Sequence, residues 1–508
     1  MERKRNKHKL YGGRQDMLIK DILIMHKDNC KVAIKYLNTE TTYRQLYSLS
    51  RAKAELLKEK KIHSNNIGIF LPNSIQYAVA YFTISFLEKV IVPIGIQAKK
   101  AEITSTAEYC ELSVIITDTQ YMEILTTYFE GFKYKVVVFN MDDNCFYEIG
   151  MEELAITEEH NNCVENKTAI MLHTSGTTSN PKRVMLTHKN LVTNVLSNIK
   201  SLKLTKHDKV LIALPMFFGY CNTAQFLTHI YIGALIVIMD GMFMPNKFFR
   251  MVQDERITNF TGVPSMLLTL LNYRNKYKYD IYSLRYICFG GGNMPIEKLK
   301  LLLSAFPSVG FVQTYGQTEA SPRVTALLPE YALSKIGSVG RPIPNVNVRI
   351  VNQNGSDVGI GEMGEIIVQG ENVMKGYYKN AEETLKVIKD GWLYTGDLAV
   401  YDNEGYIYLV GRKKNMIISG GINIYPEEIE ELLMCHPSVK EVCIVGEEQE
   451  LLGETPIAKI VLRDDESGVS EGELKNYCMD NLANYKVPSR VEFVKEIPKT
   501  ATGKIKRY

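Results

Sequence analysis

Short apolar runs alternate with helical patterns through about the first 400 residues of the chain. The runs at 65–72, 113–118 and 135–140 are rich in Val and Ile, which predicts buried strands. Residues 74–87 and 265–271 have the pattern of helices placed between such strands. This alternation is typical of an α/β architecture with largely parallel sheets.

The pattern changes near Asn345, where the segments become β-rich and are punctuated by glycine, with no long helix between them. We expect a sheet or a barrel-like subdomain there. Beyond a boundary near residues 412–414, the pattern predicts a small α+β unit with a helix at 426–434, strands at 441–446 and 456–462, a helix at 471–482 and a last strand at 491–497. The boundary near residues 412–414 therefore predicts a large N-terminal domain, 1–411, and a small C-terminal domain, 412–508.

Composition narrows the class of protein. The 508 residues exceed what one hydrophobic core usually serves, and 45% apolar with 23% charged residues is ordinary for a globular protein. The net charge of +3 gives no reason to expect nucleic acid as a partner. The nine cysteines form no CxxC pair, which favours a reduced cytoplasmic setting without disulfides or zinc. The apolar windows are too short to predict a transmembrane segment.

One polar segment, TSGTTSNPKRV at 174–184, has a composition suited to phosphate. Strands are expected on both sides, at 169–173 and 184–187, so the segment joins them as a hairpin rather than as a strand-to-helix Walker loop. Five hydroxyl side chains, Lys182 and Arg183 offer donors and positive charge to an anion. A polar hairpin tip without a ligand has the same composition.

Other short motifs carry groups suited to a nucleotide. In YGQTEAS the Tyr315 ring can stack on a base and Glu319 can hold a divalent cation. The glycines of FGGGN at 289–293 permit close approach of the backbone to a flat ligand. WLYTGD ends in Asp397, a carboxylate suited to a ribose diol, and GRKKN carries Arg412. Each motif alone is also typical of an ordinary turn.

Taken together and in this order, the motifs resemble those of the adenylate-forming superfamily. That superfamily comprises acyl-CoA synthetases, peptide-synthetase adenylation domains and firefly-type luciferases. The resemblance runs from about residue 40 to 508 and rests on TSGTTSNPKRV, LPMFFGY, FGGGN, YGQTEAS, GEIIVQGENVMKGYY, WLYTGDL, GRKKNMIISGGINIYPEEIE and PKTATGKIKR. It implies two half-reactions, in which a carboxylate attacks the α-phosphate of ATP and a thiol then displaces AMP from the acyl-AMP.

The resemblance also implies a role for each matching residue. Nucleotide contacts would come from Thr174, Ser175, Gly176, Thr177, Thr178, Lys182, Gly291, Gly292, Asn293, Tyr315, Gly316, Asp397 and Arg412. Lys504, Thr318 and Glu319 would be catalytic, with Glu319 holding Mg²⁺. The acyl pocket would include Phe217, Phe218, Gly219, Gly262, Gly290 and Gln317. Lys414 would be the pivot of a rotating C-terminal domain, and Gly420 and Gly421 would leave room for a pantetheine arm.

The chain departs from the family pattern at several positions. Ser179 and Arg183 replace usual glycines, so we expect a cost if the loop needs positive φ there. Asn415 replaces a common acid after the hinge, which predicts a missing local ion pair. Phe218 stands where many acyl-CoA synthetases carry His and predicts an apolar wall. Residues 216–222 contain no acid to pair an α-ammonium, so a fatty or aryl acid is favoured over an α-amino acid.

Three functions remain open. The leading one is an AMP-forming acyl-CoA ligase that uses ATP, Mg²⁺ and CoA. A second would load the phosphopantetheine of a separate acyl carrier protein. A third is a catalytically weak homologue that binds nucleotide. The sequence contains nothing that indicates a luciferase-like oxygenase, and it does not predict the oligomeric state.

Overall fold

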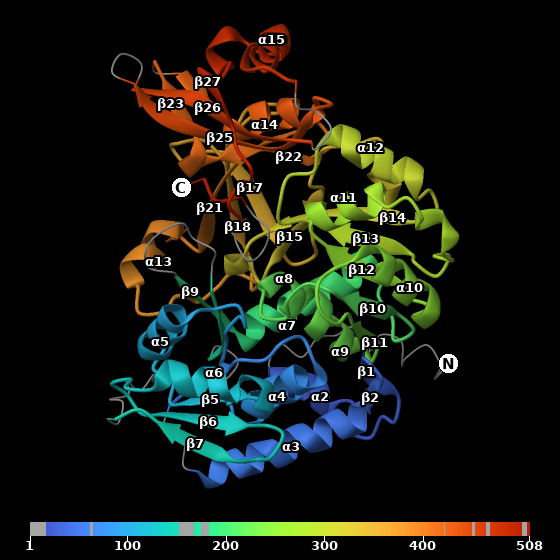
Figure 1. Ribbon diagram of the computed structural model, residues 1–508, viewed down its shortest axis with the longest axis vertical. Coiled ribbons are helices and arrows are strands. Elements are labelled where there is room, and N and C mark those ends of the chain that lie inside the picture. The colour runs from blue at the N-terminus through green and yellow to red at the C-terminus, as the bar shows by residue number, and fades with distance from the viewer. Residues whose placement is uncertain are drawn as a thin grey trace.

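The computed structural model describes residues 17–60, 64–151, 167–173, 182–420, 422–449, 453–463, 468–499 and 505–507. The molecule is elongated, with helix α3 (Tyr43–Glu59) at one end and helix α15 (Glu471–Asn481) at the other (Figure 1). Within these ranges, no helix is both long and apolar enough to cross a bilayer.

The first large sheet is built from nine strands, β1 (Val32–Tyr36), β2 (Thr39–Thr42), β10 (Lys209–Ile212), β11 (Leu235–Ile238), β12 (Asn259–Gly262), β13 (Tyr286–Phe289), β14 (Gly310–Gly316), β15 (Arg323–Leu327) and β16 (Arg341–Pro342). They lie in the order β16-β15-β14-β13-β12-β10-β11-β1-β2. The strands from β14 to β1 pair in parallel, whereas β2, β15 and β16 are antiparallel to their neighbours. The parallel strands β12 and β13 are buried at every position, as helices on both faces require.

The second large sheet has eight strands, β3 (Asn66–Ile69), β4 (Val90–Pro93), β5 (Val114–Thr117), β6 (Val136–Asn140), β7 (Phe146–Ile149), β8 (Thr168–His173), β9 (Arg183–Thr187) and β19 (Gly376–Tyr377). The three strands predicted in this region are confirmed as β3, β5 and β6, and they pair in parallel. The predicted hairpin is also confirmed, because β8 and β9, the strands on either side of the polar segment at 174–184, pair antiparallel. Residues 174–181 of that segment lie outside the described ranges.

Helices cover both faces of the two large sheets. They are α2 (Ile19–Ile24), α3, α4 (Ile75–Phe86), α5 (Lys100–Tyr109), α6 (Thr119–Phe129), α7 (His188–Leu202), α8 (Gly219–Cys221), α9 (Thr228–Ile232), α10 (Pro245–Glu255), α11 (Pro264–Asn272) and α12 (Ile296–Ala305), with a π-helical turn, η2 (Asn222–Leu227), and the 3-10 turns η3 (Lys276–Lys278) and η5 (Pro329–Tyr331). The predicted helices are confirmed as α4 and α11. Ser74 caps α4 by accepting a hydrogen bond from the Tyr77 amide, and Thr187 caps α7 in the same way.

Three apolar cores separate these layers. Successive residues of β5 point to opposite faces: Val114 and Ile116 enter the core between the two sheets, whereas Ile115 joins Phe129 of α6 in an outer core. Phe248 of α10 belongs to the core on the outer face of the nine-stranded sheet. The large domain is therefore a five-layer α–β–α–β–α arrangement.

A third sheet follows the predicted change of pattern near Asn345. Its strands are β17 (Asn347–Val351), β18 (Gly364–Gln369), β20 (Ile388–Lys389), β21 (Trp392–Tyr401) and β22 (Ile407–Arg412), all antiparallel, and α13 (Ala381–Val387) precedes β20. Figure 1 shows this sheet between the two large sheets and the C-terminal region. It forms the base on which the last part of the chain rests.

The C-terminal region is a small α+β unit with its own core. It contains β23 (Ile417–Ser419), β24 (Ile422–Ile424), α14 (Pro426–Cys435), β25 (Val439–Gln449), β26 (Gly453–Leu462), α15, the turn η7 (Asn484–Lys486) and β27 (Arg490–Phe493). Ile429 and Leu433 of α14 pack on Ile444 and Ile460 of the sheet. The predicted helices and strands are confirmed, although β27 is shorter than expected. The structure is a mixed α/β fold with a large N-terminal and a smaller C-terminal domain, as predicted.

Candidate functional site

A carboxylate and a guanidinium face each other across two strands of the third sheet. The register of β21 and β22 places Asp397 directly opposite Arg412. The Arg412 Nε lies 2.6 Å from Asp397 Oδ1, and the Tyr315 hydroxyl donates to Oδ2 at 2.7 Å. The Asp397 charge raises the pKa of Arg412, and burial together with that charge raises the pKa of Tyr315. Tyr315 and Arg412, two residues predicted to contact nucleotide, thus both contact a third, Asp397.

A cavity of about 280 Å³ opens beside this cluster. It is lined by Thr395, Gly396, Arg412, Lys413 and Lys414. Lys414 belongs to the 3-10 turn η6 (Lys413–Asn415), and burial followed by the Arg412 charge lowers its pKa. The predicted hinge residue therefore lines the same cavity as the arginine predicted to hold the ribose, and the cations there suit a phosphate or a ribose.

The two predicted catalytic residues before the C-terminal region lie in one tight turn. Thr318 and Glu319 belong to the 3-10 turn η4 (Thr318–Ala320), directly after β14 and the half-buried Gln317. The Tyr377 hydroxyl donates to Glu319 Oε1 at 3.0 Å. Gly316, at the end of β14, lies so close to β15 that a side chain at this position would meet the Pro322 carbonyl at 1.9 Å. The packing of β15 therefore fixes where this turn begins.

Lys182 contacts the ring of Tyr377, whose hydroxyl binds Glu319. Its Nζ donates to Glu383 Oε2 at 2.5 Å and lies 4.9 Å from the centre of the Tyr377 ring. The pairing of β19 with β9 brings Tyr377 to this position. Lys182 and Glu319 thus meet at one tyrosine, whereas the remaining loop residues (Thr174, Ser175, Gly176, Thr177, Thr178 and Ser179) lie outside the described ranges. Tyr377 falls within a motif used for the resemblance, but the sequence assigned it no role.

The expectation that Arg183 is strained is wrong. Arg183 begins strand β9, and it is not among the residues with positive φ. Its side chain is buried, and Nη2 donates to Thr106 Oγ1 of α5 at 2.5 Å. Burial and the Arg183 charge lower the pKa of His173 to about 4. The antiparallel pairing of β8 with β9 holds Arg183 in an extended conformation that suits any residue.

The glycine motif after β13 presents an open backbone. Gly291 has a φ of 79°, and Gly291, Gly292 and Asn293 are exposed. Gly290 differs, because a side chain there would lie 2.4 Å from the Thr314 carbonyl of the neighbouring strand β14. Gly290 therefore serves the packing of two strands, and the exposed backbone begins at the next residue.

The predicted acyl-pocket residues fall into two groups. The Phe217 and Phe218 rings lie 4.3 Å apart and are half-buried, and the buried Gly219 lies next to Thr318, whose Cγ2 is 3.8 Å from where a Gly219 Cβ would stand. By contrast, a side chain at Gly262 would point at Phe260, in the outer core. The segment that carries the two phenylalanines thus approaches the predicted catalytic turn at Gly219, whereas a side chain at Gly262 would point into the outer core.

The C-terminal region meets the hinge through a second guanidinium–carboxylate cluster. The expected ion pair at position 415 is replaced by a hydrogen bond, in which Asn415 Nδ2 donates to Glu427 Oε1 at 3.0 Å. Arg507 Nη2 donates to Glu430 Oε2 at 2.8 Å, and its Nη1 donates to the Ile444 carbonyl at 2.7 Å. Sequence reasoning assigned no role to Arg507 or Glu430, although Arg507 falls within the last motif.

Of three further residues predicted in this region, the structure describes only Gly420. Gly420 is exposed with a φ of 56°, between β23 and β24, as a tight turn requires. Gly421 and Lys504 lie outside the described ranges. Lys504 is three residues before Arg507 in the sequence, so the Arg507 contacts fix the end of the segment that carries it.

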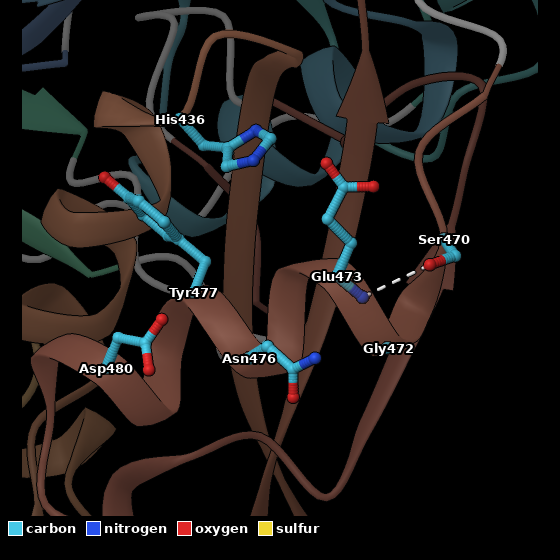
Figure 2. A pocket seen from close by; sticks show the side chains of 7 residues that line it. All are labelled: His436, Ser470, Gly472, Glu473, Asn476, Tyr477 and Asp480. Carbon is cyan, nitrogen blue, oxygen red and sulfur yellow. Dashed lines mark hydrogen bonds between the residues drawn. The ribbon is translucent and has the colours of Figure 1, made fainter.

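A second hollow, of about 590 Å³, lies on the C-terminal domain. Figure 2 shows this hollow along α15, from Ser470 and Glu473 at the start of the helix to Asp480. The His436 and Tyr477 rings, which also line it, lie 4.9 Å apart. The Ser470 hydroxyl accepts a hydrogen bond from the Glu473 amide, which caps the helix. None of the predicted site residues lines this hollow.

Comparison with known proteins agrees with this geometry. The family model of AMP-binding enzymes matches residues 25–378, and that of the AMP-binding enzyme C-terminal domain matches residues 428–504. A 2-succinylbenzoate–CoA ligase of Bacillus licheniformis is 32% identical, with 92% of this chain and 94% of that enzyme aligned. A feruloyl-CoA synthase of an Amycolatopsis species is also 32% identical, over 93% and 94% of the two chains.

Solved structures of one relative show the same fold in several states. The o-succinylbenzoate CoA synthetase of Bacillus subtilis is 29% identical over 96% of this chain, and its complex with the acyl-adenylate intermediate, 96% of whose chain is covered, gives a TM-score of 0.84. Its complex with ATP and magnesium ion gives the same score, with 98% of that chain covered. A double mutant bound to a product analogue gives 0.69, with 96% covered. The chain therefore belongs to the AMP-binding enzyme family, as an adenylate-forming enzyme of the acyl-CoA ligase type.

Proposed function

We propose that this enzyme activates a fatty or aryl carboxylic acid with ATP and then transfers the acyl group to the thiol of CoA. In the first step a carboxylate oxygen of the acid bonds to the α-phosphorus, and the bond to pyrophosphate breaks. In the second step the thiol sulfur bonds to the acyl carbon, and the bond to AMP breaks. The observation that carries the proposal is the contact of Tyr315, Asp397 and Arg412 beside a cavity lined by cations.

The chain's own residues supply binding and charge neutralisation, which suffice for nucleotidyl transfer. Asp397 and Arg412 would hold the ribose, and Gly291 and Gly292 with Tyr315 would frame the base. Thr318 would contact the α-phosphate, and Lys182 would reach the outer phosphates by leaving Glu383. Lys504 would bridge the acid and the phosphate, which makes it the main catalytic residue of the first step.

Magnesium fits the residues present at Glu319. One carboxylate oxygen accepts the Tyr377 hydroxyl, which orients the group and leaves its other oxygen available for a cation. Mg²⁺ prefers such oxygen ligands and commonly combines one or two carboxylates with substrate phosphates. When bound, the ion would neutralise part of the phosphate charge.

The domain arrangement supports an assignment to the first half-reaction. The TM-score is 0.84 against the acyl-adenylate complex of the Bacillus relative and 0.69 against its product-analogue complex, at equal identity and coverage. A division of the chain at residue 412 with a pivot at Lys414 would account for this difference. Gly420 and Gly421 would line the approach of the thiol after rotation.

The acceptor and the compartment are part of the same proposal. The names of the relatives favour CoA over a carrier protein and include aryl acids, 2-succinylbenzoate and ferulate. The described cysteines are all free thiols, which supports a reducing cytoplasmic setting.

One experiment tests the proposal. ATP–pyrophosphate exchange is measured with a panel of carboxylic acids, followed by addition of CoA or of a holo-carrier protein. Exchange followed by acyl-CoA formation is the expected result. Exchange without consumption of CoA would favour carrier loading, and no exchange with any acid would favour a nucleotide-binding homologue. In the Lys504→Ala variant, we expect exchange to be lost and thioester formation from supplied acyl-AMP to persist.

A further inference from the structure

Arg323 is a charged side chain buried in the interior of the large domain, and no carboxylate of the described residues forms an ion pair with it. It begins strand β15, directly after the turn that carries Thr318 and Glu319, and it is 2% exposed. Its Nε and Nη1 atoms have no hydrogen-bond partner among the described residues. The buried carboxylate of Asp208 does not serve it, because Asp208 is paired with Arg285 at 2.8 Å.

The Arg323 guanidinium acts on Tyr220, the residue that follows the predicted acyl-pocket residues 217–219. Burial raises the pKa of Tyr220 to about 12, and the Arg323 charge opposes this shift, as it does for the buried thiol of Cys288. Tyr220 follows the Phe217–Gly219 segment, and its hydroxyl is 2.7 Å from Thr314 Oγ1. Thr314 in turn packs against Gly290. Arg323 therefore neighbours Tyr220 in the segment that flanks Thr318.

The surroundings of Arg323 contain further polar atoms without partners. His229 Nε2 is buried and unpartnered within the described residues, and the pKa of His229 is lowered to about 4 by burial, with a contribution from the Arg323 charge. A neutral imidazole cannot compensate a guanidinium. The adjacent η2 turn is π-helical, a form often found at functional sites, and both side-chain polar atoms of Asn222 within it lack a hydrogen-bond partner in the described part of the chain.

A buried cation is costly unless an anion with good geometry compensates it. The protein supplies no such carboxylate among its described residues, and Arg323 acts on Tyr220, which directly follows the predicted acyl-pocket residues 217–219. We propose that Arg323 binds a second carboxylate of the substrate, so that the enzyme activates dicarboxylic acids; this rests on the proposed function and names its substrate class. One carboxylate would be adenylated beside Thr318, and the other would pair with Arg323.

The test compares matched acids in ATP–pyrophosphate exchange. Each pair has the same chain or ring and ends either in a methyl group or in a carboxylate: hexanoate against adipate, octanoate against suberate, and 4-(4-methylphenyl)butanoate against 4-(4-carboxyphenyl)butanoate. The monomethyl ester of each diacid is the third arm. We expect kcat/KM for the best diacid to exceed that of its methyl-ended partner and of its ester by about 100-fold, as for a buried charge pair.

Variants then locate the recognition. We expect Arg323→Met to lose the preference by lowering kcat/KM for the diacid about 100-fold while leaving KM for ATP unchanged, and Arg323→Lys to retain part of it. Arg285→Met is the matched control, because Arg285 is half exposed and already pairs with Asp208. The Arg285→Met enzyme should rank the acids as the wild-type enzyme does.

The outcomes separate this inference from the proposed function. Exchange with monocarboxylic acids but not with diacids overturns the inference alone. Equal use of diacids and their monomethyl esters also overturns it, because the enzyme would then not recognise the charge of the second carboxylate. No exchange with any acid overturns both. Should Arg323→Met fail to fold, the ranking of acids by the wild-type enzyme still decides.

Discussion

The nucleotide side and the acyl side of the site treat positive charge in opposite ways. On the nucleotide side Arg412 is paired with Asp397 and Lys182 is paired with Glu383. On the acyl side Arg323 is more deeply buried than either and lacks a carboxylate among the described residues. Paired charges are held ready in a fixed position, whereas an unpaired one destabilises the empty protein until something compensates it.

The difference follows from what each side must bind. Ribose and phosphates are common to every nucleotide, so a preorganised cluster serves at all times. An acid is chosen among competitors, and an unpaired group rejects any ligand that leaves it unpaired. The comparison therefore assigns positioning to the nucleotide side and selection to the acyl side.

Disrupting the Asp397–Arg412 pair on the nucleotide side should give the largest loss of activity. Asp397→Asn removes the charge that holds Arg412 and Tyr315, so we expect kcat/KM for ATP in the exchange assay to fall by about 10²- to 10³-fold. Asp402→Asn is the control, because Asp402 lies just beyond the same strand and pairs with Lys335 at 2.9 Å, away from the site. An Asp397→Asn enzyme within fivefold of the wild type would contradict the role of this cluster.

The C-terminal cluster offers a second paired guanidinium on which to test the same rule. Burial raises the pKa of Glu430, and the Arg507 guanidinium opposes this shift. Arg507→Met would release the segment that carries Lys504, so we expect the exchange rate to fall by about 30- to 100-fold.

Thioester formation from supplied acyl-AMP is the readout that separates positioning from general damage. We expect Arg507→Met to leave that rate within about threefold of the wild type, and Arg507→Lys to restore part of the exchange rate. The exposed Arg490, which pairs with Glu447 at 2.8 Å, is the control position. Equal losses in both half-reactions would show that Arg507 merely stabilises the domain.

Much of the fold was predictable because it rests on local patterns. The β5 run alternates between two cores, and the Thr187 side chain caps α7 through a contact within one turn of the chain. The resemblance placed Tyr315, Asp397 and Arg412 in one site, and the structure brings them into contact. Their contact depends on the antiparallel register of β21 and β22, which no local pattern specifies.

The rest could not be predicted because it depends on contacts between distant segments. Tyr377 meets Glu319 and Lys182 only through the pairing of β19 with β9. Arg183 was expected to be strained, yet the strand pairing holds it extended and buried on Thr106. Arg323 stands in the apolar sequence of a short strand, and the sequence does not show which face of that strand is buried.

Replacing Arg323 on the acyl side and Arg412 on the nucleotide side should change the free energy of unfolding in opposite directions. Arg323→Met removes a buried charge without leaving a carboxylate unpaired, so we expect the free energy of unfolding of the ligand-free protein to rise by about 1 to 3 kcal/mol. Arg412→Met leaves Asp397 buried and unpaired and should lower it by a similar amount. Denaturant unfolding of both variants without nucleotide measures the difference. A loss of stability in Arg323→Met equal to that in Arg412→Met would mean that the protein itself compensates Arg323.

Disrupting the half-exposed pair of Lys182 with Glu383 on the nucleotide side should give the smallest effect. Glu383→Gln releases Lys182 for phosphate, and since such surface pairs contribute about 0 to 1 kcal/mol, we expect KM for ATP to fall by no more than about fivefold. The hydrogen bond from Lys182 lowers the pKa of Glu383 to about 2, so the pair is lost only as the pH falls toward that value. The effect should thus be equal at pH 6 and pH 8.5, and it should shrink at high salt. Glu382→Gln, on the neighbouring exposed residue, is the control. A rise in KM for ATP would instead show that Glu383 positions Lys182 for the nucleotide, which would extend preorganisation to this cation as well.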